Sequence, residues 1–169
     1  MSAIKNIFIS KQKLSENQLE TYQYSLGKSF PKIEMKGKEK RKYMIINLQF
    51  KVNDIKDKLK ILGELFVKKN NKILRIIFNN KESKPLFSIN INKEDKKKGF
   101  KKIILKLYDN LISLHSMFYG CSSLISVSDI SYLETKMIKS ISRLFYGCRK
   151  IANLPDISNW NTFNVTDIS

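Results

Sequence analysis

Two segments of the chain carry the same two-part sequence motif at the same spacing. Phe118-Tyr119-Gly120-Cys121 precedes Asp129-Ile130-Ser131, and Phe145-Tyr146-Gly147-Cys148 precedes Asp156-Ile157-Ser158. Both parts of the motif recur after 27 residues. A fixed period of roughly 20–50 residues is typical of repeat proteins, in which each unit stacks on its neighbour. We therefore expect two stacked units near the carboxyl end, with residues 115–141 aligned to residues 142–168.

The repeat positions predict the local structure of each unit. Leu114, Met117 and Phe118 have the i, i+3, i+4 spacing of a short helix that ends at a glycine. Equivalent positions before the two helices, and at the start of a third phase, hold good N-cap residues, namely Ser113, Ser140 and Asp167. The phenylalanines of the motif are expected to face the core in this arrangement, and the tyrosines to be more exposed.

The second unit resembles a known family. After Cys148 its motif continues as Arg149-Lys150-Ile151 and then as Leu154-Pro155-Asp156-Ile157-Ser158-Asn159-Trp160-Asn161-Thr162. This pattern is similar to the BspA-like leucine-rich repeats of bacterial and protist surface and interaction proteins. The first unit departs from that pattern at residues 132–137. The resemblance implies a leucine-rich-repeat solenoid that binds other macromolecules through a face of stacked strands, and it implies no active site.

The first two thirds of the chain have a different pattern. Ser15-Glu16-Asn17-Gln18 is a capping box that predicts a helix over residues 16–26. Period-two alternation predicts a strand over residues 44–52. Four further strands are expected over residues 59–67, 73–78, 86–91 and 102–107, the second being the hairpin partner of the first, with polar loops at residues 36–42 and 92–99.

These patterns together predict an α+β fold in two domains. Residues 1–110 are expected to form a lysine-rich, strand-rich module with one helix, and residues 111–169 a short leucine-rich-repeat solenoid at the start of a longer array. The charge changes at the same boundary: of the net charge of +17, residues 1–110 hold +16 and residues 111–169 hold +1. Only four of the 32 basic residues are arginine, so the positive charge is an unspecific signal. It fits a solvated surface with a biased composition, or a polyanion site on the lysines of residues 36–42 and 93–102.

The chain offers little for catalysis or metal binding. Cys121 and Cys148 are its two cysteines, and His115 is its one histidine. A disulfide, a metal pair and a redox switch are alternatives, but a zinc site needs four ligands, and two buried thiols are the favoured interpretation. Asp129 and Asp156 are expected to bind turn backbone rather than to act as acid and base. We expect no enzyme activity, no cofactor and no metal.

The predicted function is a non-catalytic leucine-rich-repeat scaffold for protein–protein interaction. Positions within the repeat select five candidate partner-binding residues, namely Tyr119, Tyr146, Arg149, Asn159 and Asn161. The partner is expected to be a protein of unknown identity, with self-association through the open carboxyl-terminal repeat end as a further expectation. Binding of nucleic acid or an anionic membrane through the amino-terminal lysines is the alternative. The sequence shows no signal peptide or membrane span, so a cytoplasmic location is the default, and the resemblance also permits the cell surface.

Overall fold

The computed structural model describes residues 32–36, 39–108 and 111–169, which belong to one compact unit, Pro31–Ser169. The helix predicted over residues 16–26 lies outside the described residues. The division into two domains at residue 110 stays a prediction.

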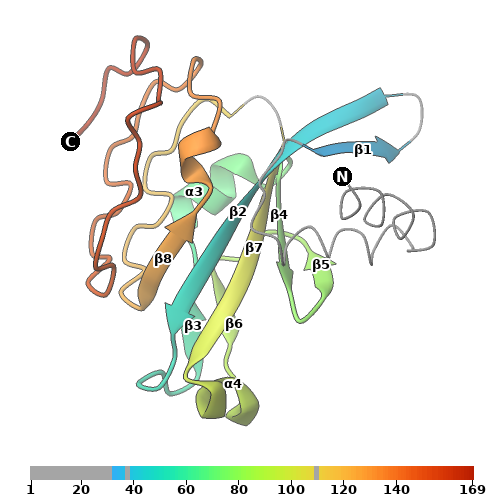
Figure 1. Ribbon diagram of the computed structural model, residues 1–169, viewed down its shortest axis with the longest axis vertical. Coiled ribbons are helices and arrows are strands. Elements are labelled where there is room, and N and C mark those ends of the chain that lie inside the picture. The colour runs from blue at the N-terminus through green and yellow to red at the C-terminus, as the bar shows by residue number, and fades with distance from the viewer. Residues whose placement is uncertain (1–31, 37–38, 109–110) are drawn as a thin grey trace, which may run out of the picture. The chain divides into compact units, whose positions relative to one another are not determined.

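The described part of the chain is built around an antiparallel sheet (Figure 1). Its strand order is β1-β2-β7-β4-β5, and β8 adds to it by pairing with β2. The strands are β1 (Lys32–Lys36), β2 (Glu39–Lys51), β4 (Leu74–Phe78), β5 (Lys81–Ser83), β7 (Phe100–Tyr108) and β8 (Leu124–Ser128). A separate two-stranded sheet joins β3 (Lys58–Lys60) to β6 (Ser88–Asn90). The short helices are α3 (Glu64–Asn70), α4 (Lys93–Lys98) and the 3-10 turn η1 (Ile130–Tyr132).

Strand β2 is the centre of this arrangement and confirms the strand predicted over residues 44–52. Its alternation buries Ile46, Leu48 and Phe50. One edge of β2 pairs with β7 from Tyr43 to Lys51. The other edge is shared, because its first residues pair with β1 and residues 47–50 pair with β8. The sheet and residues 111–169 thereby enclose one hydrophobic core.

Three predictions for the amino-terminal elements are wrong. The polar loop expected over residues 36–42 is largely strand, because β1 extends to Lys36 and β2 begins at Glu39. Residues 59–67 do not form one strand: β3 ends at Lys60, and α3 begins after Gly63, whose N–H donates to the Met117 carbonyl (2.8 Å). The hairpin expected between this segment and β4 is therefore absent from the described sheet, where β4 pairs with β5 and β7.

The expected loop at residues 92–99 contains helix α4. Asn92 accepts a hydrogen bond from the Asp95 N–H (2.8 Å), the Asp95 carboxylate accepts one from the Asn92 N–H (3.3 Å), and Gly99 ends the helix at φ 77°. These contacts are a complete capping box and a left-handed C-cap, signals that the run of lysines obscured in the sequence. The strand expected over residues 102–107 is confirmed as part of β7.

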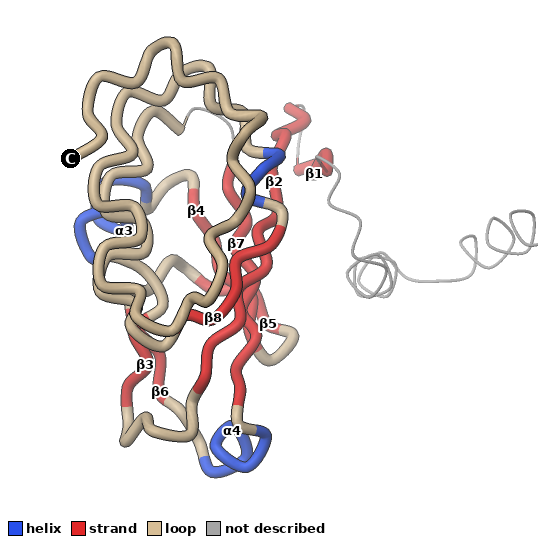
Figure 2. The backbone as a smooth tube through the Cα atoms, turned by 60° about the vertical axis from the view of Figure 1, so that its left-hand side comes forward, coloured by secondary structure: helices blue, strands red, loops and turns tan. Residues whose placement is uncertain are grey.

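The prediction of a leucine-rich-repeat solenoid is wrong. Residues 111–169 are mostly turns and loops (Figure 2). Their one strand, β8, pairs antiparallel with β2 of the main sheet instead of stacking in parallel on a strand of the second unit. Leu154, expected in that second strand, is 66% exposed. The predicted short helices are also absent from these residues, because Ser116 (φ 58°) and Arg143 (φ 53°) adopt left-handed backbone that an α-helix cannot contain.

Candidate functional site: the tyrosine pair and the outer edge

The two units lie against each other through their backbones. The N–H groups of Leu114, Ser116, Phe118 and Gly120 donate to the carbonyls of Ser140, Ser142, Leu144 and Tyr146 at 2.7–2.9 Å. The second unit repeats the pattern, since Ile141 and Arg143 donate to the carbonyls of Asp167 and Ser169. We call the backbone of residues 141–147 the outer edge. The 27-residue period is thus confirmed as a structural equivalence between the two units.

Rings of equal repeat position stack beside this backbone contact. Phe118 and Phe145 lie 5.4 Å apart between ring centroids at 13°, on the core side. Tyr119 and Tyr146, which we call the tyrosine pair, lie 5.3 Å apart at 8°. The Lys60 ammonium lies 5.4 Å from the Tyr119 ring centroid, within the range of a cation–π contact. Tyr146 is 65% exposed.

Three residues of equal repeat position cap the turns. Ser113 accepts a hydrogen bond from the His115 N–H (3.1 Å), and Ser140 accepts one from the Ser142 N–H (3.3 Å). The Asp167 carboxylate accepts a hydrogen bond from the Ser169 N–H (3.3 Å). They were predicted as helix caps and instead cap turns, because their side chains reach the N–H two residues on.

The aspartate carboxylates of the repeats accept hydrogen bonds from neighbouring polar groups. The hydroxyls of Ser140 (2.9 Å) and Ser169 (3.0 Å) donate to Asp167 and hold the pKa of its carboxyl below the usual value. Asp156 binds the Ser158 N–H (2.9 Å), as predicted, and this bond lowers its pKa. Asp129 differs, because it accepts from the Asn47 amide (2.8 Å) while its own φ is 72°.

The cysteines are buried thiols, as favoured from the sequence. Cys121 and Cys148 are both free, and the Cys148 thiol donates to the Phe118 carbonyl (3.1 Å). Burial raises the pKa of both thiols, that of Cys148 to about 11. Thiols held in the protonated form are poor nucleophiles and poor metal ligands.

The other predicted binding residues do not join the tyrosine pair. Arg149, Asn159 and Asn161 are exposed, and no hydrogen bond or ion pair among the described residues links them to Tyr119 or Tyr146. The Asn161 side chain accepts from the Phe163 N–H (3.1 Å), which makes it a turn residue. Five candidates chosen by repeat position thus yield one structural pair and three separate surface residues.

Exposed apolar side chains concentrate in residues 111–169. Thirteen large hydrophobic side chains are exposed among the described residues, and nine of them lie in this segment. The nine are Ile112, Tyr119, Tyr132, Met137, Tyr146, Leu154, Ile157, Phe163 and Ile168. Since the segment carries a net charge of only +1, its surface differs in chemistry from the lysine-rich part of the chain.

Several lysines proposed for polyanion binding have intramolecular partners. Lys101 is buried against Asp95 (2.7 Å) and Asn79 (2.8 Å). Lys98 pairs with Glu94 (2.7 Å), and Lys96 donates to the Lys56 carbonyl (2.6 Å). Side chains before residue 43 are outside the description, so the lysines of residues 36–42 stay a prediction.

Sequence reasoning missed Lys60 and the outer edge. Lys60 lies 59 residues before Tyr119 along the chain and belongs to no motif. The outer edge consists of backbone N–H groups, which no residue type reveals. The 27-residue equivalence was the signal available, because the N–H positions of the second unit follow from those of the first.

The contacts above define a repeat-containing, strand-rich protein with exposed aromatic side chains. Among its described residues, no group of three or more His, Cys, Asp or Glu side chains could hold a metal ion. The family model described as Mycoplasma protein of unknown function, DUF285, matches residues 95–169. No curated protein and no solved structure matches the chain. The resemblance to BspA-like leucine-rich repeats is therefore wrong, since the matching family is DUF285. Within the described part of the chain, no helix is long and apolar enough to cross a bilayer.

Proposed function

We propose that residues 111–169 form a non-catalytic surface for protein–protein interaction. The observation that carries this proposal is the concentration of nine exposed large hydrophobic side chains on a nearly uncharged segment. Exposed apolar surface is a feature of interaction sites, in which tyrosine is enriched. The stacked tyrosine pair adds aromatic contact area, which tyrosine supplies at low entropic cost.

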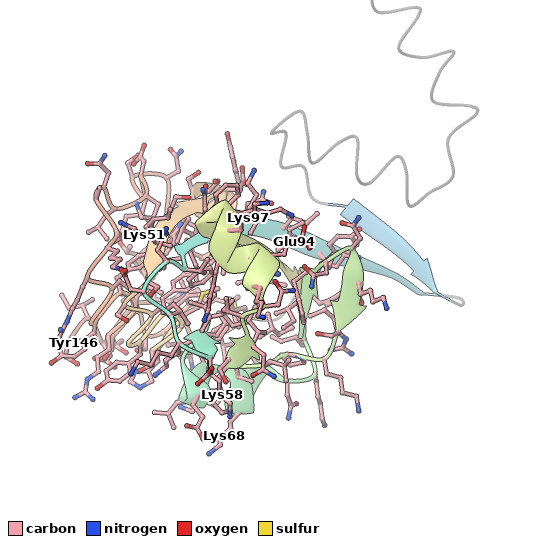
Figure 3. All side chains as sticks on the ribbon, turned by 90° about the horizontal axis from the view of Figure 1, so that it is seen from below. Lys51, Lys58, Lys68, Glu94, Lys97 and Tyr146 are labelled. Carbon is pink, nitrogen blue, oxygen red and sulfur yellow. The ribbon has the colours of Figure 1, made fainter. Side chains whose placement is uncertain are left out.

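Polyanion binding through the lysine-rich part is the second candidate. Lysines on α4 and nearby strands support it, and Figure 3 shows Lys51 and Lys97 at the α4 end of the molecule. Two observations count against the 93–102 segment, because Lys101 is buried in an ion pair and Lys98 pairs with Glu94. A polyanion site also requires steep salt dependence, since each phosphate neutralised adds to the slope.

The test is affinity capture from a lysate of the source cell with two matched double variants. Leu154→Ser with Phe163→Ser changes exposed apolar residues, and Lys93→Gln with Lys97→Gln changes exposed lysines. Capture is carried out at about 0.1 M and about 0.3 M salt, with and without nuclease. The proposal expects a protein that survives nuclease and higher salt and is lost only with the apolar variant. Loss of all captured material on nuclease treatment, or with the lysine variant alone, would overturn it in favour of polyanion binding.

A further inference from the structure

A second group of exposed apolar side chains lies outside the repeats, where the two-stranded sheet meets α3. Among the described residues before residue 111, the exposed large hydrophobic side chains are Leu65, Leu86, Phe87 and Phe100. The first three come from neighbouring segments, because the Phe87 carbonyl accepts from the N–H groups of Ile61 (2.9 Å) and Leu62 (3.3 Å), and α3 begins two residues later. These three side chains are between 42% and 54% exposed.

Helix α3 turns an apolar side chain and two lysines to solvent together. Its buried residues are Phe66, Val67 and Asn70. Leu65 is exposed, and Lys68 and Lys69 follow it by three and four positions and are exposed as well. Residues at this spacing are neighbours on a helix, so Leu65 lies beside positive charge.

The chain around these apolar side chains is basic. Residues 58–72 and 84–90 contain six lysines, no arginine and one acidic residue, which gives a net charge of +5. The acidic residue, Glu64, is paired with Lys68 (2.9 Å). In Figure 3, Lys58 of β3 and Lys68 of α3 project from the same side of the molecule, away from Lys97 of α4. We call the exposed side chains of residues 58–72 and 84–90 the basic apolar surface.

The composition of the basic apolar surface limits what can occupy it. A second copy of the chain brings like charge, since the whole chain carries +17. Protein interfaces are enriched in arginine and depleted in lysine, which is the opposite of the composition here. Recognition of nucleic acid also favours the planar fork of arginine, and the aliphatic side chains of Leu65 and Leu86 offer no ring on which bases could stack. An anionic bilayer accepts both components, because its diffuse negative potential attracts lysine and its interface takes up apolar side chains.

We propose that the basic apolar surface binds an anionic lipid bilayer. Leu65, Leu86 and Phe87 enter the boundary between headgroups and acyl chains. The surrounding lysines keep their ammonium groups among the headgroups, with their aliphatic stems along the apolar side chains. This inference goes beyond the proposed protein-binding function, which rests on residues 111–169 and requires no membrane.

The test is sedimentation of the full chain with lipid vesicles. One set of vesicles contains phosphatidylcholine alone, and the other contains about 30% phosphatidylglycerol, each at about 0.1 M and about 0.3 M salt. Binding is expected only to the anionic vesicles, and it should weaken at the higher salt. Lys58→Gln with Lys69→Gln should weaken it about 20-fold, because one lysine near an anionic surface contributes about fivefold. Leu65→Ser with Phe87→Ser should weaken it at least about tenfold, because less apolar area leaves water.

Matched variants elsewhere on the chain serve as controls. Lys93→Gln with Lys97→Gln removes the same charge, and Leu154→Ser with Phe163→Ser makes the same kind of apolar change. Both should keep vesicle affinity within about twofold, since charges more than about 10 Å from the membrane are screened at 0.1 M salt. Circular dichroism checks that each variant is folded. Leu65→Ser alone changes only a side chain on the exposed side of α3, and it keeps the test usable if the Phe87 variant unfolds.

A fluorescent label reports whether the apolar side chains enter the bilayer. Cys121 and Cys148 are buried, so Leu65→Cys places an environment-sensitive fluorophore at one exposed position. Its emission should shift to the blue with anionic vesicles and stay unchanged with neutral ones. The same label on Phe163→Cys should show no shift.

Four results would overturn the inference. These are no binding to anionic vesicles at the lower salt, equal binding to neutral vesicles, equal losses in the control variants, and unchanged affinity of both the double and the single apolar variants. The last result would leave a surface that binds polyanions by charge alone. The proposed function is tested separately, because protein capture depends on Leu154 and Phe163 and vesicle binding does not.

Discussion

Removing the carboxylate of Asp95 should destabilise the protein strongly. The Lys101 ammonium is 5% exposed and lies 2.7 Å from Asp95 Oδ1 and 2.8 Å from Asn79 Oδ1. Asp95→Ala leaves this charge buried with one neutral acceptor, and breaking a buried ion pair in this way costs about 3–5 kcal/mol. Asp95 also closes the capping box of α4, which adds about 1 kcal/mol. We therefore expect a loss of about 5 kcal/mol and, with an m-value of about 2 kcal/mol/M, a fall of about 2.5 M in the urea midpoint.

A double-mutant cycle followed by circular dichroism in urea checks the cause. Asp95→Ala combined with Lys101→Met removes both charges and should recover about half of the loss, because no buried charge remains. Lys68→Met is the control, since its pair with Glu64 (2.9 Å) is exposed and worth less than about 0.5 kcal/mol. The reasoning is refuted if Asp95→Ala costs under about 1 kcal/mol, or if the double variant loses as much as the sum of the single ones.

Three further predictions concern two glycines outside the repeats and two residues within them. Gly63→Ala should cost at least about 3 kcal/mol by urea denaturation, because its Cβ would overlap the Ser116 carbonyl. The control Gly99→Ala should cost only about 1 kcal/mol, and similar costs for the two variants would count against the close approach at Gly63. Burial raises the pKa of the Cys148 thiol to about 11 from its ordinary value of 9.0. The unfolded state therefore loses this proton first, and the stability of the fold should decrease as pH rises from about 9 to about 11. A Cys148→Ser variant should show a smaller decrease. Trp160, the one tryptophan, is buried and donates to the Ile130 carbonyl (3.0 Å), so its fluorescence should shift to the red only on unfolding, and red emission from the native protein would contradict its placement.

Periodicity predicted more of this molecule than residue type did. The alternation in β2 and the 27-residue equivalence both appear in the structure, because each reports which side chains share one environment. The two cysteines are buried as favoured from their residue type, whereas the stacking of the two tyrosines was not predicted. What failed was the conclusion about architecture, since a repeat period shows that two units are alike and not what their strands pair with.

The misread elements have a common physical reason. Residues 59–67 are apolar enough for a strand, but Gly63 binds the Met117 carbonyl, more than fifty residues away, and the chain turns into α3 there. Helix α4 is six residues long, and its caps were hidden in a charged run. The short helix expected at residues 114–118 gave way to turns because Ser116 takes a left-handed conformation. Each outcome depends on tertiary contacts that local propensity does not contain.

The double pairing of one edge of β2 has a consequence for synthesis on the ribosome. Residues 47–50 of that edge are covered by β8, which lies about eighty residues further along the chain. At roughly 5–20 residues per second, the nascent chain passes several seconds with this hydrophobic strand edge open. Uncovered strand edges template pairing with other chains. We expect the growing polypeptide to require a chaperone during that interval, and fragments that end before residue 124 to aggregate.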